Sequence, residues 1–225
     1  MELLDKLRSL VNRYVTVSVT PPPSSDPPCN VLVVFGNPDS TKSFSAEISR
    51  HAVKALLARG NQVKIVNVSD GSFDPLLRGA EFTERYERPV QHADLQSHVA
   101  LLKWCDKIVW IYPTWWSSVP AGLKGWIDRV FAAGIAYKTP TDPGANILPL
   151  LSIKKTAVIT TWGGSNLLPL YTGDLGRRLL CRSLTISCYR NRFPETLYLK
   201  LHNVYKSESR REAFLAKVED QMKLF

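Results

Sequence analysis

The sequence KIVWIYPTWWSSVPAGLKGWIDRVF, residues 107–131, joins an apolar run to an amphipathic stretch through a loop with two tryptophans and two prolines. The run 107–112 is rich in β-branched and aromatic residues and predicts a strand. Because proline suits the first turn of a helix, Pro120 indicates a helix over 120–133. Exposing tryptophan in a loop is unfavourable. The loop 113–120 is therefore either covered by the rest of the protein or made to cover a planar ligand.

The same alternation of strand and helix recurs on both sides of this stretch, from residue 30 onward. VLVVF (31–35) fits a strand buried on both faces, and residues 43–59 carry apolar side chains on one helical face before Gly60. The expected strands are 31–35, 63–68, 107–112, 156–161 and 197–201, and the expected helices are 43–59, about 94–105, 120–133 and 207–223. This alternation predicts an α/β fold with a doubly wound, five-stranded parallel sheet.

The composition is that of a globular protein. The 225 residues include 44% hydrophobic and 22% charged residues, and no apolar run reaches the ~20 residues that span a bilayer. The four cysteines form no CxxC pair, which favours a reducing compartment, so we expect a cytoplasmic location. The four histidines are scattered without the spacing of metal ligands, and no metal site is expected.

The formal net charge of +9 could attract nucleic acid, anionic lipid or phosphorylated small molecules. Much of the basic excess lies beyond residue 150. No zinc-finger or RNA-binding motif accompanies it, so no nucleic-acid partner is expected. A basic binding module without a cofactor remains the weaker alternative function.

Residues 1–29 differ from the rest and are expected to form a segment separate from a domain over 30–225. Apolar side chains at helical spacing predict a short amphipathic helix, namely Leu3, Leu4, Leu7, Leu10, Val11 and Tyr14. TPPPSSDPP (20–28) is typical of an extended linker. We expect the helix to pack on the core or on a neighbouring subunit. Contact of residues 1–19 with a membrane surface is the alternative.

The loops after the predicted strands are the candidate ligand sites, because open parallel sheets bind ligands beyond the carboxyl ends of their strands. After the first strand, GNPDSTKSFS (36–45) offers hydroxyls from Ser40, Thr41, Ser43 and Ser45. The following helix start offers free N–H groups and a positive dipole end, which favour phosphate. The loop is neither GxGxxG nor a nucleotide-triphosphate P-loop. An ordinary helix cap such as Ser43 is the alternative.

Two further loops carry flat or glycine-rich surfaces. PTWWSSVP (113–120) follows the third strand, and TTWGGSN (160–166) follows the fourth with two adjacent glycines that permit close approach of a ligand to the backbone. The alternatives are tryptophans that pack on a helix or subunit, and a simple tight turn. Together with the hydroxyl-rich loop, these two loops meet the requirements of a flavin mononucleotide group.

From about Asn30 to the C-terminus, the chain resembles the flavodoxin-like NAD(P)H:quinone oxidoreductases, and most of all the shorter bacterial-type NAD(P)H-dependent oxidoreductases. The resemblance is carried by YPTWWSSVPAGLKGWIDRVF (112–131), TTWGGS (160–165) and YTGDLGRRLL (171–180). It implies a flavodoxin-like sheet of strand order 2-1-3-4-5, a flavin cofactor that is either FMN or FAD, NAD(P)H as electron donor, and a homodimer.

The resemblance also implies which residues hold the flavin. Phosphate contacts fall on Ser43, Phe44 and Ser45, with Asn37 where the family usually has a histidine. The remaining cofactor contacts fall on Pro113, Thr114, Trp115, Trp116, Thr160, Thr161, Trp162, Gly163 and Gly164.

The implied substrate-binding residues are Tyr137 and Trp162. Tyr171 is the candidate catalytic residue, but Thr172 stands where a partner histidine would be expected. Whether a Tyr/His proton relay exists is therefore left open.

The implied activity is reduction of quinones or similar planar acceptors by NAD(P)H, through ping-pong hydride transfer on the flavin. The small-molecule acceptor would enter the site after the oxidised nicotinamide leaves. A flavoprotein regulatory subunit of a membrane transport protein is the alternative, and a flavin-free basic binding module the weaker one.

Overall fold

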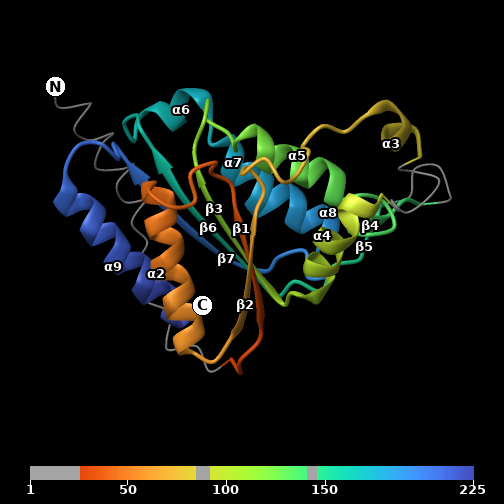
Figure 1. The fold of residues 1–225 in the computed structure, drawn as a ribbon, viewed down its shortest axis with the longest axis horizontal. Coiled ribbons are helices and arrows are strands. Elements are labelled where there is room, and N and C mark those ends of the chain that lie inside the picture. The colour runs from red at the N-terminus through yellow and green to blue at the C-terminus, as the bar shows by residue number, and fades with distance from the viewer. Residues whose placement is uncertain (1–25, 85–91, 141–145) are drawn as a thin grey trace.

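A computed structural model describes residues 26–84, 92–140 and 146–225 (Figure 1). Its centre is one sheet of five parallel strands in the order β2-β1-β3-β6-β7. The strands are β1 (Asn30–Phe35), β2 (Gln62–Asn67), β3 (Lys107–Pro113), β6 (Lys155–Trp162) and β7 (Glu195–His202). The predicted doubly wound α/β sheet of order 2-1-3-4-5 is confirmed. The helix expected in residues 1–19 lies outside the described residues.

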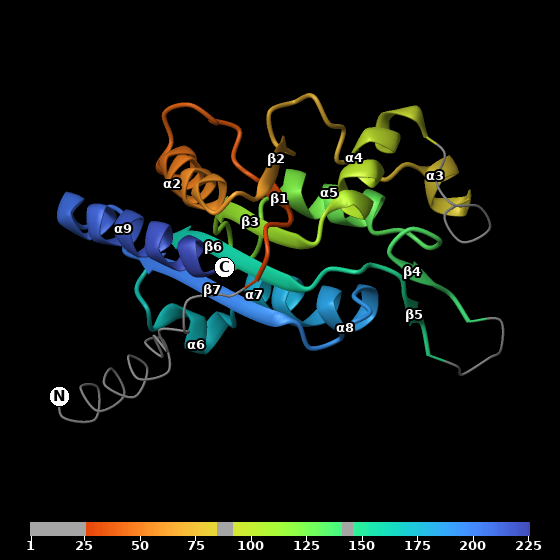
Figure 2. The ribbon, with the colours of Figure 1, turned by 90° about the horizontal axis from the view of Figure 1, so that it is seen from below.

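Helices cover both faces of the sheet (Figures 1 and 2). One face carries two helices that lie side by side, α2 (Phe44–Ala58) and α9 (Glu208–Leu224). The other face carries α4 (Ala93–Trp104), α5 (Ala121–Val130) and a continuous run made of α7 (Leu175–Arg178), the π-helical turn η1 (Leu179–Ser183) and α8 (Leu184–Cys188). The long predicted helices are all present.

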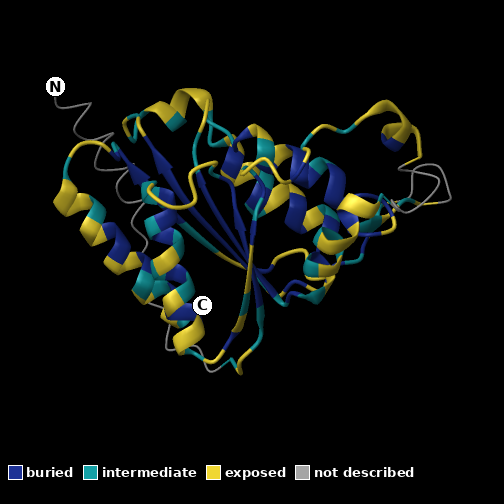
Figure 3. Ribbon diagram, in the orientation of Figure 1, coloured by how far each residue is buried: buried dark blue, intermediate teal, exposed yellow. Residues whose placement is uncertain are grey.

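The two faces have separate cores because successive side chains of a strand point to opposite sides. In β1, Leu32 and Val34 pack with α4 and α5, whereas Val31, Val33 and Phe35 pack with α2 and α9. All five side chains are buried, as a strand of continuous apolar residues requires. Figure 3 shows the central strands as the most buried part of the molecule.

Four short elements lie outside this scaffold and were not predicted. They are α3 (Gly79–Glu84), α6 (Leu168–Thr172) and the antiparallel ribbon of β4 (Tyr137–Lys138) and β5 (Leu148–Pro149). Elements of two to six residues are too short to show a helical or strand periodicity in the sequence. In Figure 1 the ribbon and α6 lie at opposite sides of the molecule.

The chain enters the domain at the base of the sheet, below the amino ends of the strands. The Asp26 carboxylate lies 3.0 Å from both Lys107 Nζ and Lys155 Nζ. Hydrogen bonds from Lys155 and then Lys107 lower the pKa of Asp26 to about 2. Arg59 Nη2 donates to the backbone oxygen of Asp26, which ties this entry point to the end of α2. Residues 26–28 of the predicted linker are thus attached to the domain.

Searches over the described residues add three findings. No helix among them is both long and apolar enough to cross a membrane. They contain no group of three or more histidine, cysteine or acidic side chains placed to hold a metal ion. All four cysteines are free thiols.

Candidate functional site

In the loop between β1 and α2, backbone N–H groups bind the carboxylate of a residue in the same loop. The Asp39 carboxylate accepts hydrogen bonds from the backbone N–H groups of Thr41 and Lys42 at 3.0 and 2.9 Å. The Lys42 bond, followed by the Thr41 bonds, lowers the pKa of Asp39. This loop therefore presents backbone amides in a geometry that suits negative oxygen atoms.

Ser43 is the N-cap of α2, as the alternative interpretation of the sequence held. Its hydroxyl accepts from Ala46 N and donates to the backbone oxygen of Asp39. The N–H groups of Phe44 and Ser45 lie in the first helical turn, where no intrahelical carbonyl can reach them. A cap and an anion site are thus compatible here, because the cap leaves those two amides and the positive end of the helix dipole available.

The loop after β3 folds into a two-residue hairpin turn with an unusual sequence. Trp115 N donates to Ser118 O at 3.1 Å and Ser118 N to Trp115 O at 2.9 Å. The central residues, Trp116 and Ser117, have φ of 49° and 64°. A turn with two positive φ values normally takes Asn-Gly, and each other residue costs roughly 1–2 kcal/mol in this region.

The strained turn displays the Trp116 indole to solvent, with 98% of the residue exposed. Neither burial nor a local backbone preference therefore explains the tryptophan. Strain at an exposed aromatic residue is the kind of outlier that marks a binding site. The rest of the protein therefore leaves Trp116 uncovered, and Trp115 is half-exposed beside it.

The loop after β6 lies directly beside the tryptophan loop. Thr114 N donates to Thr161 O at 2.8 Å, and the hydroxyls of Thr114 and Thr160 are 2.9 Å apart. At Gly163 an added Cβ would meet only the exposed Tyr205 ring, at 3.5 Å, so the backbone there is open to a ligand. Two loops that the sequence separates by some forty-five residues thus form one surface.

Trp162 belongs to this loop through its backbone, but its side chain is buried below. The indole stacks on His202 with ring centroids 5.8 Å apart, and Lys200 Nζ lies 3.7 Å from its centroid. Lys200 pairs with Asp174 at 2.8 Å, and the Tyr198 hydroxyl donates to the same carboxylate at 2.6 Å. The Trp162 side chain is thus part of the support beneath the loop rather than of its open surface.

Burial sets the titration of this supporting cluster. Burial lowers the pKa of Lys200, and the Asp174 carboxylate opposes that change. Burial, followed by the Lys200 charge, lowers the pKa of His202 to about 4. At neutral pH the cluster therefore holds one lysine–aspartate ion pair and a neutral imidazole under Trp162.

The His202 imidazole should make stability depend on pH. Its folded pKa lies below the ordinary value of about 6.5, so its contribution is complete above pH 6.5 and is lost as pH falls toward 4. We expect a loss of about 3 kcal/mol in the free energy of unfolding across this window. Urea unfolding at several pH values would measure it. His202→Gln, which cannot titrate, should show a smaller loss, and equal losses would contradict the assignment.

The remaining predicted residues are distributed as follows. The Asn37 side chain accepts from Asp39 N and shapes the loop after β1. Tyr171 is exposed on α6, where its neighbour Thr172 accepts a hydrogen bond from Ser117 at 2.9 Å. Tyr137 is half-buried on the β4–β5 ribbon, apart from the three loops of its own chain.

Sequence reasoning missed Asp39 and the cluster of Lys200, His202 and Asp174. A signal for the two β7 residues does exist in ETLYLKLH, where Tyr198, Lys200 and His202 alternate with leucines. Polar residues on one face of a strand in a buried sheet indicate a local requirement for charge.

The family model that matches residues 29–174 is described as a flavodoxin-like fold. This match covers more than half of the chain. The chain belongs to the flavodoxin-like fold family. The family expected from residues 112–131 and 160–165 is thereby confirmed.

Several relatives of this flavodoxin-like chain have names that state an activity. It is 31% identical over 119 residues to an uncharacterized NAD(P)H oxidoreductase of Haemophilus influenzae, across 53% of this chain and 58% of that protein. It is 30% identical over 152 residues to NAD(P)H dehydrogenase [quinone] 1 of Rattus norvegicus, across 60% of this chain and 53% of that protein. The chain thus matches little more than half the length of these curated relatives.

Solved structures extend the similarity over most of the chain. Smu.1420 from Streptococcus mutans UA159 aligns with a TM-score of 0.73 and 26% identity, over 87% of this chain and all of that one. An NAD(P)H:quinone oxidoreductase from Methanothermobacter marburgensis aligns with a TM-score of 0.71 and 24% identity, over 87% and 95%. The second similarity supports the fold alone.

Proposed function

We propose that this protein binds a flavin on the loops after β1, β3 and β6 and transfers reducing equivalents from NAD(P)H to quinones or similar planar acceptors. The single observation that carries the proposal is the exposed Trp116, held in a strained turn beside the open backbone of Gly163. The oxidoreductase names of its relatives support the same function. They do not favour a regulatory subunit of a membrane transport protein.

The residues present fit a flavin in two places. The amides of Phe44 and Ser45, at the positive end of α2, suit a phosphate group, with the Ser43 cap holding the turn. The surface of Pro113, Thr114 and the two tryptophans, with the backbone of residues 160–164, suits the edge and face of a flat ring. When bound, the flavin would accept hydride from NAD(P)H and pass it to the acceptor. Both FMN and FAD remain candidates.

The chain's own groups would position the ring and exclude water. The Thr114–Thr160 hydroxyl pair fixes the two loops relative to each other, and the backbone of residues 162–164 would face the ring edge. The Lys200–Asp174 ion pair would support the backbone of that loop, because Lys200 lies directly beneath the Trp162 indole.

The substrate side of the site would be completed by a second copy of the chain. Tyr137 is the residue that motivates this part of the proposal, since the β4–β5 ribbon holds it away from the three loops of its own chain. A homodimer would let one ribbon cover the loops of its partner. The cytoplasm is the proposed location, where NAD(P)H is available.

An absorption spectrum of the purified full chain, titrated with FMN and separately with FAD, tests the proposal. Bands near ~375 and ~450 nm that bleach with NADPH under anaerobic conditions and return with a quinone are the expected result. A protein that takes up neither flavin would overturn the proposal. If the protein binds flavin but neither NADPH nor NADH reduces it, the proposed binding site would stand and the proposed activity would be refuted.

Trp116→Asn should separate ligand binding from stability. The flavin Kd should rise roughly tenfold, because a stacked aromatic ring is lost. The free energy of unfolding without flavin should stay equal or rise by up to about 1 kcal/mol, because asparagine tolerates positive φ and the indole has no packing to lose. Fluorescence titration and urea unfolding would measure the two.

Phe193→Asn is the matched control, since Phe193 is 84% exposed away from the three loops. It should leave the flavin Kd unchanged. Equal weakening by both substitutions would mean that Trp116 has no specific contact with the ligand.

A further inference from the structure

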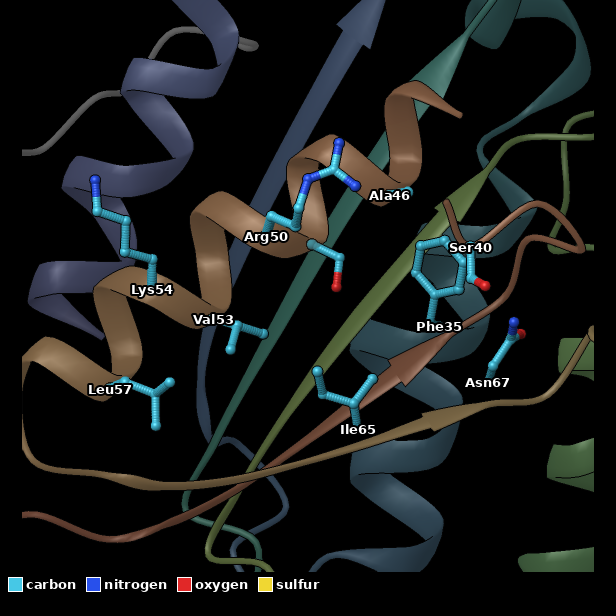
Figure 4. Close-up of a pocket in the computed structure, with 10 residues that line it drawn as sticks. Phe35, Ser40, Ala46, Arg50, Val53, Lys54, Leu57, Ile65 and Asn67 are labelled. Atoms are coloured by element: carbon cyan, nitrogen blue, oxygen red, sulfur yellow. The ribbon is translucent and has the colours of Figure 1, made fainter. Parts of the chain in front are cut away.

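A groove on the side of the domain begins at the loop after β1 and continues along α2, away from the groups assigned to the flavin. It runs between α2 and the edge strand β2 and has a volume of about 590 Å³ (Figure 4). Its lining includes Val53 and Leu57 from α2 and Ile65 from β2, with Ser40 and Asn67 at one end and the basic side chains of α2 along the rim.

The groove exists because α2 lies over the middle of the sheet. Its buried residues pack with β1, β3 and α9, which leaves the same face of β2 only partly covered by the described residues. Leu57 is 53% exposed and Ile65 54% exposed in consequence. Two large aliphatic side chains that face each other across an open groove indicate a surface that another apolar element covers.

The chain's own N-terminal segment is an apolar element that lies outside the described residues. The first described residue, Asp26, is bonded through its backbone oxygen to Arg59. Arg59 follows Leu57 by two positions, so the chain before Asp26 starts from the Leu57 end of the groove. Residues 3–14 carry six apolar side chains at helical spacing.

The length of the N-terminal segment agrees with the length of the groove. A helix from Leu3 to Tyr14 would be ~17 Å long, and the part of α2 that lines the groove, from Ala46 to Leu57, has the same number of residues and the same length. Residues 15–25, when extended, can span up to ~36 Å, which is enough to reach either end of the groove.

We propose that residues 3–14 form a helix whose apolar face occupies the α2–β2 groove of the same chain. The helix covers Leu57 and Ile65 and turns its charged side chains to solvent. The N-terminal segment is then an integral part of this face of the domain. The groove shares Ser40 with the proposed phosphate loop, but the inference does not require a bound flavin.

Thiol accessibility in the full chain tests the proposal. Ile65→Cys places a reporter in the groove, and Leu76→Cys places one at a residue that is 58% exposed elsewhere. Each reporter is also made with Leu7→Asp and Leu10→Asp together, which disrupts the apolar face of the segment without touching the groove. A maleimide labels the protein under native conditions, and mass spectrometry of peptides follows the rate at each reporter.

Native thiols should compete little, because burial raises the pKa of Cys105, Cys181 and Cys188 to about 12 and also raises that of Cys29. Peptide analysis separates Cys29 from the reporters. We expect Cys at position 65 to react at least tenfold more slowly than Cys at position 76, and the double aspartate substitution to remove the difference. Position 76 should react equally with or without it.

Other occupants give other results. Similar rates at both positions would show an uncovered groove and overturn the proposal. Protection that grows with protein concentration would assign the segment to a second copy, which also contradicts docking within one chain. Protection that appears only with added flavin, and persists in the double aspartate variant, would assign the groove to the cofactor instead.

Discussion

Replacing Gly125 with alanine should lower the free energy of unfolding by about 3 kcal/mol. A Cβ at this position would overlap the backbone oxygen of Pro75 and lie 2.7 Å from its carbonyl carbon. The obstacle is backbone, which cannot rotate away as a side chain can, so α5 or the segment before α3 would have to shift. Urea unfolding of the two proteins would measure the loss.

The direction in which Gly125→Ala changes the free energy of unfolding is informative. In an unobstructed helix, alanine is more favourable than glycine by up to about 1 kcal/mol. Gly79→Ala is the matched control, since an added Cβ in α3 would meet nothing within 4 Å. Its effect should be neutral or slightly stabilising. If Gly125→Ala behaved like Gly79→Ala, the close approach of Pro75 to α5 would be refuted.

Replacing Arg129 with methionine should cost about 3–4 kcal/mol of unfolding free energy. The Arg129 guanidinium and the Glu81 carboxylate are each only 5% exposed and approach to 2.9 Å. Arg129 also donates to the Asp74 carbonyl. The substitution leaves a buried carboxylate without its partner, which is the costly way to break such a pair.

Two further variants identify the cause. Arg129→Met combined with Glu81→Leu should recover most of the loss, because the second change removes the uncompensated charge. Asp128→Asn breaks the exposed Lys124–Asp128 pair next to it and should cost no more than about 0.5 kcal/mol. A double variant as unstable as Arg129→Met alone would attribute the loss to packing instead.

The sheet could be predicted from the sequence because its strands are buried on both faces. VLVVF and KIVWIY contain enough consecutive apolar residues to identify a strand without any alternation. The crossover helices follow, since parallel neighbours require them. The continuous run α7–η1–α8 could not be predicted, because its π-helical turn breaks the helical period that identifies longer helices.

The candidate site could be predicted only as three loops at three strand ends. Positive φ at Trp116 and Ser117 leaves no trace in the sequence, since residues in such turns are normally glycine or asparagine. The burial of the Trp162 side chain is equally hidden, because it depends on Lys200 and His202 of a neighbouring strand. The sequence locates the loops, whereas tertiary packing decides which side chains they display.

The hydrogen bond from Thr114 N to Thr161 O continues the β3–β6 ladder beyond its last paired residues. The two loops therefore stay roughly one strand spacing, ~4.8 Å, apart at their roots. The distance between the two loops cannot change without a change in the sheet, so this side of the candidate site is rigid. Under the proposed function, this fixed spacing would favour flat acceptors over bulky ones.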